Sequence, residues 1–309
     1  MSKLSPVEKL PLALRKNVRD EWDNKKSAVE KDLSDVLGTS WTIDVNPNQI
    51  YAYAEEGYAK ECLGNCIYDY FTAATRRLKQ FSDHGGAESI AELNKICHAH
   101  TLTLDLDDSS RFPYCGVDVT SGSLRLLFAP HRLGVNIDDA ASRDVLSQAL
   151  NSASAASQEG EKLSFAARED IRREYDAQIE GVRSRIGALL ERPDVRLAAN
   201  FEDTFAKLSG AAEVRDDWQG LLGSFTRLYF EGVAGRLEGL GFGRDELLRE
   251  GFNEAVTKGE IAFRVVESLG GGRIYNEVVI EDGVLYVQCT AKTWGVNIDD
   301  AAEKLVDIL

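Results

Sequence analysis

The residues best placed to do chemistry lie in a repeated octapeptide, Gly-Val-Asn-Ile-Asp-Asp-Ala-Ala, at 134–141 and 295–302. Its carboxylates are Asp138, Asp139, Asp299 and Asp300. If the two pairs meet, they offer the oxygen ligands that a divalent cation prefers, or an acid–base pair. The same residues suit a helix start, with Asn136 and Asn297 as caps and carboxylates near the helix dipole. Capping physics favours the helix start, and a contact surface for a partner is the third interpretation.

A second group of chemically capable residues occurs in the first half of the chain alone. Its members are Cys62, Cys66, Cys97, His98 and His100. Thiols and imidazoles are zinc ligands, although this spacing lacks the tight Cys-x2-Cys pairs typical of zinc sites. In the second half, Leu221, Phe225 and Val256 stand at the three cysteine positions. This correspondence favours cysteines packed as small hydrophobes, with a zinc site as the alternative.

Two further sets of residues are candidates for binding. Asp105, Asp107 and Asp108 form an Asp-x-Asp-Asp string of the kind found in some metal-dependent enzymes, and Ser109-Ser110 follows. The turn chemistry of Asp and Ser favours a solvated turn there. Trp41 and Trp294 have no aromatic counterpart in the other half, so each either packs in a core or contacts a ligand.

The elements that must position these residues are themselves repeated. Residues 114–141 align without a gap on 275–302, with 12 identities in 28 positions. At a slightly different shift, Tyr70 and Arg77 align with Tyr229 and Arg236. We therefore predict an internal duplication, because fixed-shift similarity of this length is the signature of a repeat. The predicted domains are 1–150 and 166–309, joined by a linker at 151–165 whose first part is small, polar and without periodicity.

Each half carries the same order of predicted elements. Apolar residues at spacings of three and four predict first helices at 13–37 and 166–190. More helices, three or four strands and a closing helix follow. Ser121-Gly122 and Asp282-Gly283 join the last two strands, and Asp-Gly is a strong hairpin signal. Helices grouped before strands indicate an α+β fold with a largely antiparallel meander in each half.

Composition restricts the partner and the compartment. Residues 1–150 hold 17 basic and 22 acidic side chains and residues 151–309 hold 19 and 29, for a net charge of −15. Such a surface disfavours nucleic acid, whose phosphates are bound by Lys and Arg. No apolar run reaches the roughly 18 residues of a membrane span, and the first residues lack a secretory pattern. With five scattered cysteines, these features predict a soluble cytoplasmic protein with reduced thiols.

The leading functional hypothesis is a non-enzymatic binding or assembly protein, built as a pseudo-dimer within one chain, whose partner is a protein or a small molecule. The alternative is a hydrolytic or metal-assisted enzyme with an asymmetric site on the first half, formed by its cysteines, histidines and Asp105–Asp108. No motif identifies a cofactor or a substrate. Enzymatic activity and assembly into oligomers therefore stay open at the level of sequence.

Overall fold

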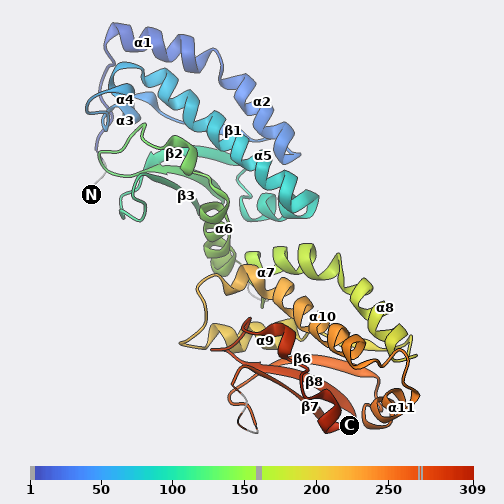
Figure 1. The fold of residues 1–309 in the computed structure, drawn as a ribbon. Coiled ribbons are helices and arrows are strands. Elements are labelled where there is room, and N and C mark those ends of the chain that lie inside the picture. Colours follow the sequence, from blue (N-terminus) through green and yellow to red (C-terminus); the bar gives the residue numbers. More distant parts are fainter. Residues whose placement is uncertain (1–3, 158–161, 271, 273) are drawn as a thin grey trace. The chain divides into compact units, whose positions relative to one another are not determined.

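The computed structural model describes residues 4–157, 162–270, 272 and 274–309. The chain divides into two compact units, Met1–Glu159 (unit 1) and Gly160–Leu309 (unit 2). Both units combine helices with a four-stranded mixed sheet (Figure 1). None of the helices within these described residues has the length and apolar character that crossing a membrane requires.

Unit 1 begins with a helical segment that is interrupted by a π-helical turn. The elements in order are α1 (Leu12–Val18), the π turn η1 (Arg19–Asp23), α2 (Lys26–Leu37), β1 (Thr42–Asp44), α3 (Pro47–Tyr51), α4 (Tyr58–Glu61), α5 (Leu63–Ile96), β2 (Thr101–Leu106), β3 (Cys115–Thr120), β4 (Ser123–Phe128), the 3-10 turn η2 (Ile137–Asp139) and α6 (Arg143–Ser157). The long α5 is kinked at Gly86, whose positive φ of 69° suits glycine.

Unit 2 has the same kind of beginning, again with a π-helical turn after the first helix. Its elements are α7 (Phe165–Asp170), the π turn η3 (Ile171–Asp176), α8 (Ile179–Leu189), β5 (Arg196–Ala198), α9 (Phe201–Ser209), the 3-10 turn η4 (Trp218–Leu221), α10 (Leu222–Leu240), α11 (Glu246–Ala255), β6 (Glu260–Val266), β7 (Asn276–Glu281), β8 (Val284–Thr290) and the 3-10 turns η5 (Ile298–Asp300) and η6 (Leu305–Ile308).

The two sheets have the same strand order and the same directions. The orders are β1-β2-β4-β3 and β5-β6-β8-β7, with the first two pairings parallel and the last antiparallel. The predicted hairpins are confirmed, and Ser121, Gly122, Asp282 and Gly283 all have positive φ, as a type I′ turn requires. The prediction of a largely antiparallel meander is wrong, because β4 and β8 each insert beside the strand that precedes the hairpin. Periodicity identifies strands but does not reveal which strands become neighbours.

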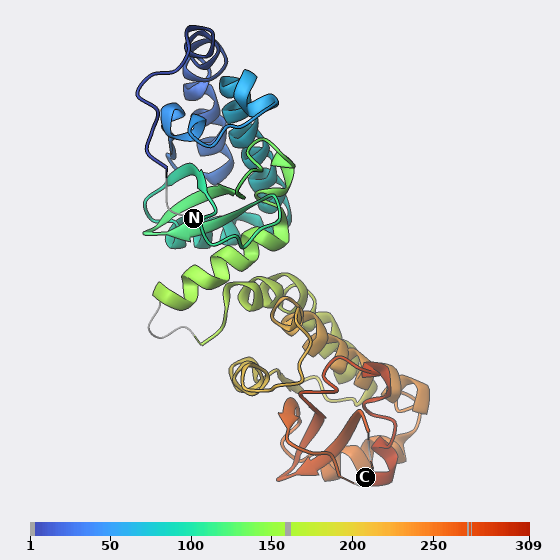
Figure 2. The same ribbon diagram turned by 90° about the vertical axis from the view of Figure 1, so that its left-hand side faces the viewer.

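One helix forms the middle layer of each unit. In unit 1, α5 packs against α1 and α2 on one side, and the sheet lies on its other side (Figures 1 and 2). Trp22 of η1 stacks on Phe71 of α5 at 5.0 Å between ring centroids. In unit 2, α10 has the same place against η3 and α8, and Tyr229 of α10 stacks on Phe263 of β6 at 4.5 Å.

The start of each central helix is capped by a side chain from another helix. Asn17 of α1 accepts a hydrogen bond of 2.7 Å from the backbone N–H of Gly64, in the first turn of α5. Asp170 of α7 accepts one of 2.8 Å from the N–H of Ser224, in the first turn of α10. Free N–H groups at a helix start need such acceptors. The cap therefore joins the first helix of each unit to its central helix.

This cap requires glycine at the crossing point. A Cβ atom on Gly64 would lie 2.5 Å from the carbonyl oxygen of Asn17, and a Cβ atom on Gly223 would lie 2.6 Å from that of Asp170. Real Cβ atoms do not approach backbone atoms so closely, so the two helices are in backbone contact at both places.

The boundary between the units lies within the predicted linker, but residues 151–157 are not irregular. They continue α6, so this helix is longer than the sequence predicted. Residues 158–161 lie outside the described residues, and α7 begins at Phe165. Alanine-rich polar sequence lacks an amphipathic pattern, yet its helix propensity is high enough to extend an existing helix.

Replacement of Gly223 by alanine tests the close helix contact. We expect Gly223→Ala to lower the free energy of unfolding of unit 2 by about 2 kcal/mol, because the new Cβ atom forces apart two backbones. Gly235→Ala in the same helix is the matched control, since open space surrounds that position. It should leave stability unchanged or raise it by up to about 1 kcal/mol. Urea unfolding measures both, and equal effects of the two substitutions would contradict the contact.

Candidate functional site

The repeated octapeptide forms a tight turn between the last strand and a 3-10 helix in each unit. Asn136 and Asn297 adopt the left-handed conformation, with φ of 51° and 49°. Neither side chain caps a helix, so the predicted Asn caps are wrong. A cap residue needs extended backbone, whereas asparagine here serves because it tolerates the left-handed region. The backbone bends outward, and the carboxylates that follow both asparagines are exposed.

A buried tyrosine holds the first residue of each turn. The N–H of Gly134 donates to the hydroxyl of Tyr70 at 3.1 Å, and the N–H of Gly295 donates to the hydroxyl of Tyr229 at 3.1 Å. Both glycines have a φ of more than 80°, in the region that favours glycine. The tyrosines come from α5 and α10, so the central helix sets the position of the turn.

The backbone carbonyls of the turn are held as well. Asn136 accepts from the thiol of Cys115 at 2.9 Å, while Asn297 accepts from the side-chain amide of Asn276 at 2.8 Å. From the central helix of unit 1, the Nε of Arg77 donates to the carbonyl of Asp138 at 2.9 Å. In unit 2, Arg236 donates at 2.8 Å to the carbonyl of Glu303, the residue that directly follows the octapeptide. The interior of each unit thus bonds to the backbone of the turn and leaves its carboxylates at the surface.

In unit 1, the turn borders a surface hollow of about 500 Å³ between the turn and α5. Asp69, Thr72 and Arg76 of α5 line it, together with Asp138 and Asp139 of the turn. Arg76 forms an ion pair with Asp138 across the hollow. The lining of this hollow therefore carries both positive and negative charge.

In unit 2, a hollow of about 350 Å³ lies on the other side of the turn, against β7. Glu277 of β7, Asp300 and Lys304 are among its lining residues. Gly235 takes the place that Arg76 has in unit 1, and within the described part of unit 2 no cation pairs with Asp299 or Asp300. The turn of unit 2 is consequently the more strongly acidic one.

A larger hollow of about 740 Å³ lies where α10 ends and α11 begins, far from these turns in the sequence. Its carboxylates include Asp245, which accepts hydrogen bonds from the N–H groups of Leu247 and Leu248 and so caps α11. We favour the smaller hollows as sites because residues singled out in the sequence line them, whereas the carboxylate of Asp245 has a structural role.

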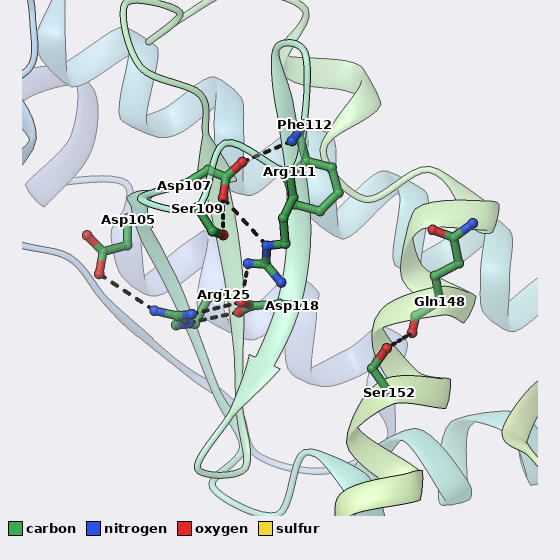
Figure 3. Close-up of polar contacts among 9 residues, drawn as sticks. All are labelled: Asp105, Asp107, Ser109, Arg111, Phe112, Asp118, Arg125, Gln148 and Ser152. Carbon is green, nitrogen blue, oxygen red and sulfur yellow. Dashed lines mark hydrogen bonds and ion pairs between the residues drawn. The ribbon is translucent and has the colours of Figure 1, made fainter. Parts of the chain in front are cut away.

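Asp105 and Asp107 enter a polar cluster at the end of β2 (Figure 3). The expected solvated turn is wrong for Asp107, whose side chain is fully buried. This carboxylate accepts from the N–H of Phe112 at 2.9 Å and from the hydroxyl of Ser109 at 3.0 Å, so it organises the loop that follows the strand. Asp108 is exposed.

Two arginines complete the polar cluster. Arg125 of β4 donates two hydrogen bonds, of 2.8 and 2.7 Å, to Asp118 of β3, and Arg111 of the loop donates one of 2.5 Å to the same carboxylate (Figure 3). Asp105 is 3.9 Å from Arg125. Burial alone would raise the pKa of Asp118, but the hydrogen bonds from both arginines outweigh it and hold this pKa below its ordinary value. The cluster fastens the loop to the sheet.

The cysteines and histidines proposed as metal ligands are not brought together. Cys62 and Cys66 lie at the start of α5 and Cys97 at its end, and the straight part of α5 before Gly86 spans about 30 Å at 1.5 Å per residue. Burial raises the pKa of Cys66 and of Cys97 to about 12, so both thiols are protonated at neutral pH.

The two histidines contact other elements. The ring of His98 lies against Gly122 in the β3–β4 hairpin, and the ring of His100 lies 5.6 Å from that of Trp41. Among the described residues, no three His, Cys, Asp or Glu side chains form a group that could hold a metal ion. The zinc site that the sequence left as an alternative is therefore not formed among the described residues.

Both unmatched tryptophans are buried. The indole N–H of Trp41 donates to Asn94 at 2.9 Å, which ties β1 to the end of α5. Trp294 packs beside Phe225 at 4.8 Å between ring centroids, and its indole N–H has no partner within the described structure. Each supports local packing, and neither reaches the hollows beside the turns.

The residues that hold the turn carry no signal in the sequence that distinguishes them from packing residues. Tyr70, Tyr229, Arg77 and Arg236 were visible as identities between the halves, but identity alone does not separate packing from anchoring. Asp69 and Arg76 had no such signal, because Leu228 and Gly235 stand at their positions in the second half.

No family model, curated protein or solved structure matches this chain.

The hydroxyl of Tyr229 offers a direct test of how the turn is held. It accepts from Gly295 and donates to Asn276 at 3.1 Å. We expect Tyr229→Phe to lower the free energy of unfolding by about 1–3 kcal/mol, because the N–H of half-buried Gly295 and the side chain of buried Asn276 lose their partner. Tyr68→Phe on α5, which removes a hydroxyl from a half-buried ring, should change stability little. Chemical denaturation of both variants gives the comparison. An unchanged stability of Tyr229→Phe would contradict the role of this hydroxyl in holding the turn.

The lowered pKa of Asp118 predicts how the stability of unit 1 changes at acid pH. Its folded pKa lies below the unfolded value near 3.9, so its ionisation stabilises the fold above that pH and the contribution disappears as the pH falls through the folded pKa. We expect Asp118→Asn to be less stable than the parent at pH 7 and to lose less stability between pH 5 and pH 2. Thermal melts across this range test it, with exposed Asp32→Asn as the control. An unchanged slope for Asp118→Asn would contradict the assignment.

Proposed function

We propose that this chain is a non-enzymatic binding protein, made of two copies of one α+β domain, which holds a basic segment of a protein partner at its acidic turns. The observation that carries the proposal is the exposure of the carboxylates beside a surface hollow in each unit, while the backbone of the same turn is bonded to the interior. A rigid turn with exposed carboxylates suits recognition, since little order has to be imposed on binding.

Several shared features support the interpretation of the units as copies. Both sheets have one strand order and one set of directions, and both first helices end in a π-helical turn. The bond between tyrosine and the glycine of the turn measures 3.1 Å in both units. Backbone contact of the central helix through Gly64 and Gly223 also occurs at equivalent positions.

Charge supports a basic partner. The chain has a net charge of −15, and the second half has 29 acidic against 19 basic residues. Opposite charges steer association and raise its rate at low salt. Two groups that an enzyme in the first half would have used are placed in the interior: the Asp107 carboxylate accepts from the N–H of Phe112, and the Cys97 thiol is buried.

Selection of random 16-residue peptides on the immobilised full chain tests the proposal. We expect the selected peptides to be rich in lysine and arginine and to bind less tightly as ionic strength rises. The double variant Asp299→Asn, Asp300→Asn should weaken their binding about tenfold, or 1.4 kcal/mol, measured by fluorescence anisotropy.

The matched control removes two exposed carboxylates elsewhere in unit 2, as Asp216→Asn with Glu254→Gln. This variant has the same net charge as the test variant and should retain most of the affinity. Peptides without a charge preference, or equal losses in both double variants, would count against recognition at the turn.

A further inference from the structure

In unit 1, a helix covers the edge of the sheet. β3 ends the strand order, so one side of its backbone has no neighbouring strand. α6 packs along β3 and beside α5, and it buries Leu146, Ala149 and Leu150. These positions follow the i, i+3, i+4 spacing of one helix face. An open edge invites pairing with other chains, and a covering helix prevents it.

In unit 2, the same edge lacks a covering helix in the described structure. β7 ends its strand order as β3 does, and the element packed against it outside the sheet is η6, a turn of four residues. At the shift of 159 that aligns Tyr70 with Tyr229, Leu305 and Leu309 stand where α6 has Leu146 and Leu150, and Leu305 is fully buried. η6 therefore supplies only the first turn of an apolar face like that of α6.

Beside η6, the edge of β7 is hollow, and part of the lining of this hollow is apolar. The cavity of about 350 Å³ is lined by residues 276–279 of β7 and by Ile308 of η6. The apolar lining residues are Val278, Val279, Ala301 and Ile308, and Ile308 is 36 % exposed. An exposed apolar side chain at a concavity favours contact with a partner.

Carboxylates add a preference for positive charge. Asp300 and Glu303 line the cavity beside Lys304, which is 3.5 Å from Asp307 and is partly neutralised by it. The carboxylate of Glu277 accepts hydrogen bonds from the N–H of Gly270 and from the side-chain amide of Gln288, so its position in the lining of the cavity is fixed. A helix that binds here thus contacts apolar lining residues and an acidic turn.

We propose that the β7 hollow is a docking site for a cationic amphipathic helix of a protein partner, which covers β7 as α6 covers β3. This proposal rests on the binding function proposed above. The docked helix places leucine and alanine at i, i+3 and i+4 against β7 and Ile308. Lysine or arginine at its flank lies near Asp300, a geometry of helix-in-groove recognition.

The probe is a fluorescein-labelled peptide of residues 142–157 with two lysines added at each end. We expect saturable binding to the full chain by anisotropy and a gain of helical circular dichroism in the peptide on binding. A peptide with Leu146→Asp and Leu150→Asp should bind at least tenfold more weakly, because its apolar face is lost.

Protein variants locate the site. Ile308→Asp should weaken binding at least tenfold, and Leu247→Asp is the control, because Leu247 is 76 % exposed on α11, outside this hollow. Both substitutions introduce the same charge at an exposed position. A photo-crosslinker at the Leu146 position of the peptide should react with residues of β7 or η6.

Other outcomes overturn the helix proposal. Binding without a gain of helicity would indicate strand addition to β7, and crosslinks to β3 would indicate exchange with α6. Concentration-dependent dimers that exclude the peptide would assign the edge to a second copy of the chain. If the labelled helix peptide does not bind, but binding of the selected basic peptides still depends on Asp299 and Asp300, the helix proposal fails and the proposed function stands. If neither the helix peptide nor the selected basic peptides bind, the helix proposal and the proposed function both fail.

Discussion

The backbone contact at Gly64 in unit 1 and at Gly223 in unit 2 is the constraint on which the rest of each unit depends. It brings the first helix so close to the central helix that Asn17 or Asp170 can cap the central helix from outside. A larger residue would separate the two backbones and leave N–H groups of the central helix without an acceptor. Because α5 and α10 also carry Tyr70 and Tyr229, their placement determines where the repeated turn is held.

In the repeated turn, the backbone has a structural role, whereas the carboxylates of the same residues lie at the surface. Its backbone is bonded to the interior by tyrosine, arginine and either Cys115 or Asn276, so its shape is fixed before any partner arrives. Its carboxylates receive none of these bonds. In unit 1, Arg76 balances Asp138, whereas Gly235 at the equivalent position leaves the turn of unit 2 acidic. A common framework therefore carries surfaces of different charge.

The edges of the two sheets differ in a related way. α6 covers β3 with a face of leucine and alanine. The shorter η6 leaves a hollow beside β7 whose lining is partly apolar. The differences in charge and in edge cover both fall near the repeated turn of unit 2. Both features lie on the surface where we propose that a basic, partly apolar partner binds.

The sequence by itself determined the repeated octapeptide, the two hairpins with their positive-φ turns and the first helices, because local spacing and turn chemistry specify these. It also identified the acidic turn as a site to consider. Only the tertiary structure decided that β2 and β4 are parallel neighbours, that Asp107 is buried and that Cys66 and Cys97 lie at opposite ends of α5. It alone placed Asp69 and Arg76 beside the turn. These facts depend on contacts between residues far apart in the chain, and such contacts leave no periodic signal in the residues that make them.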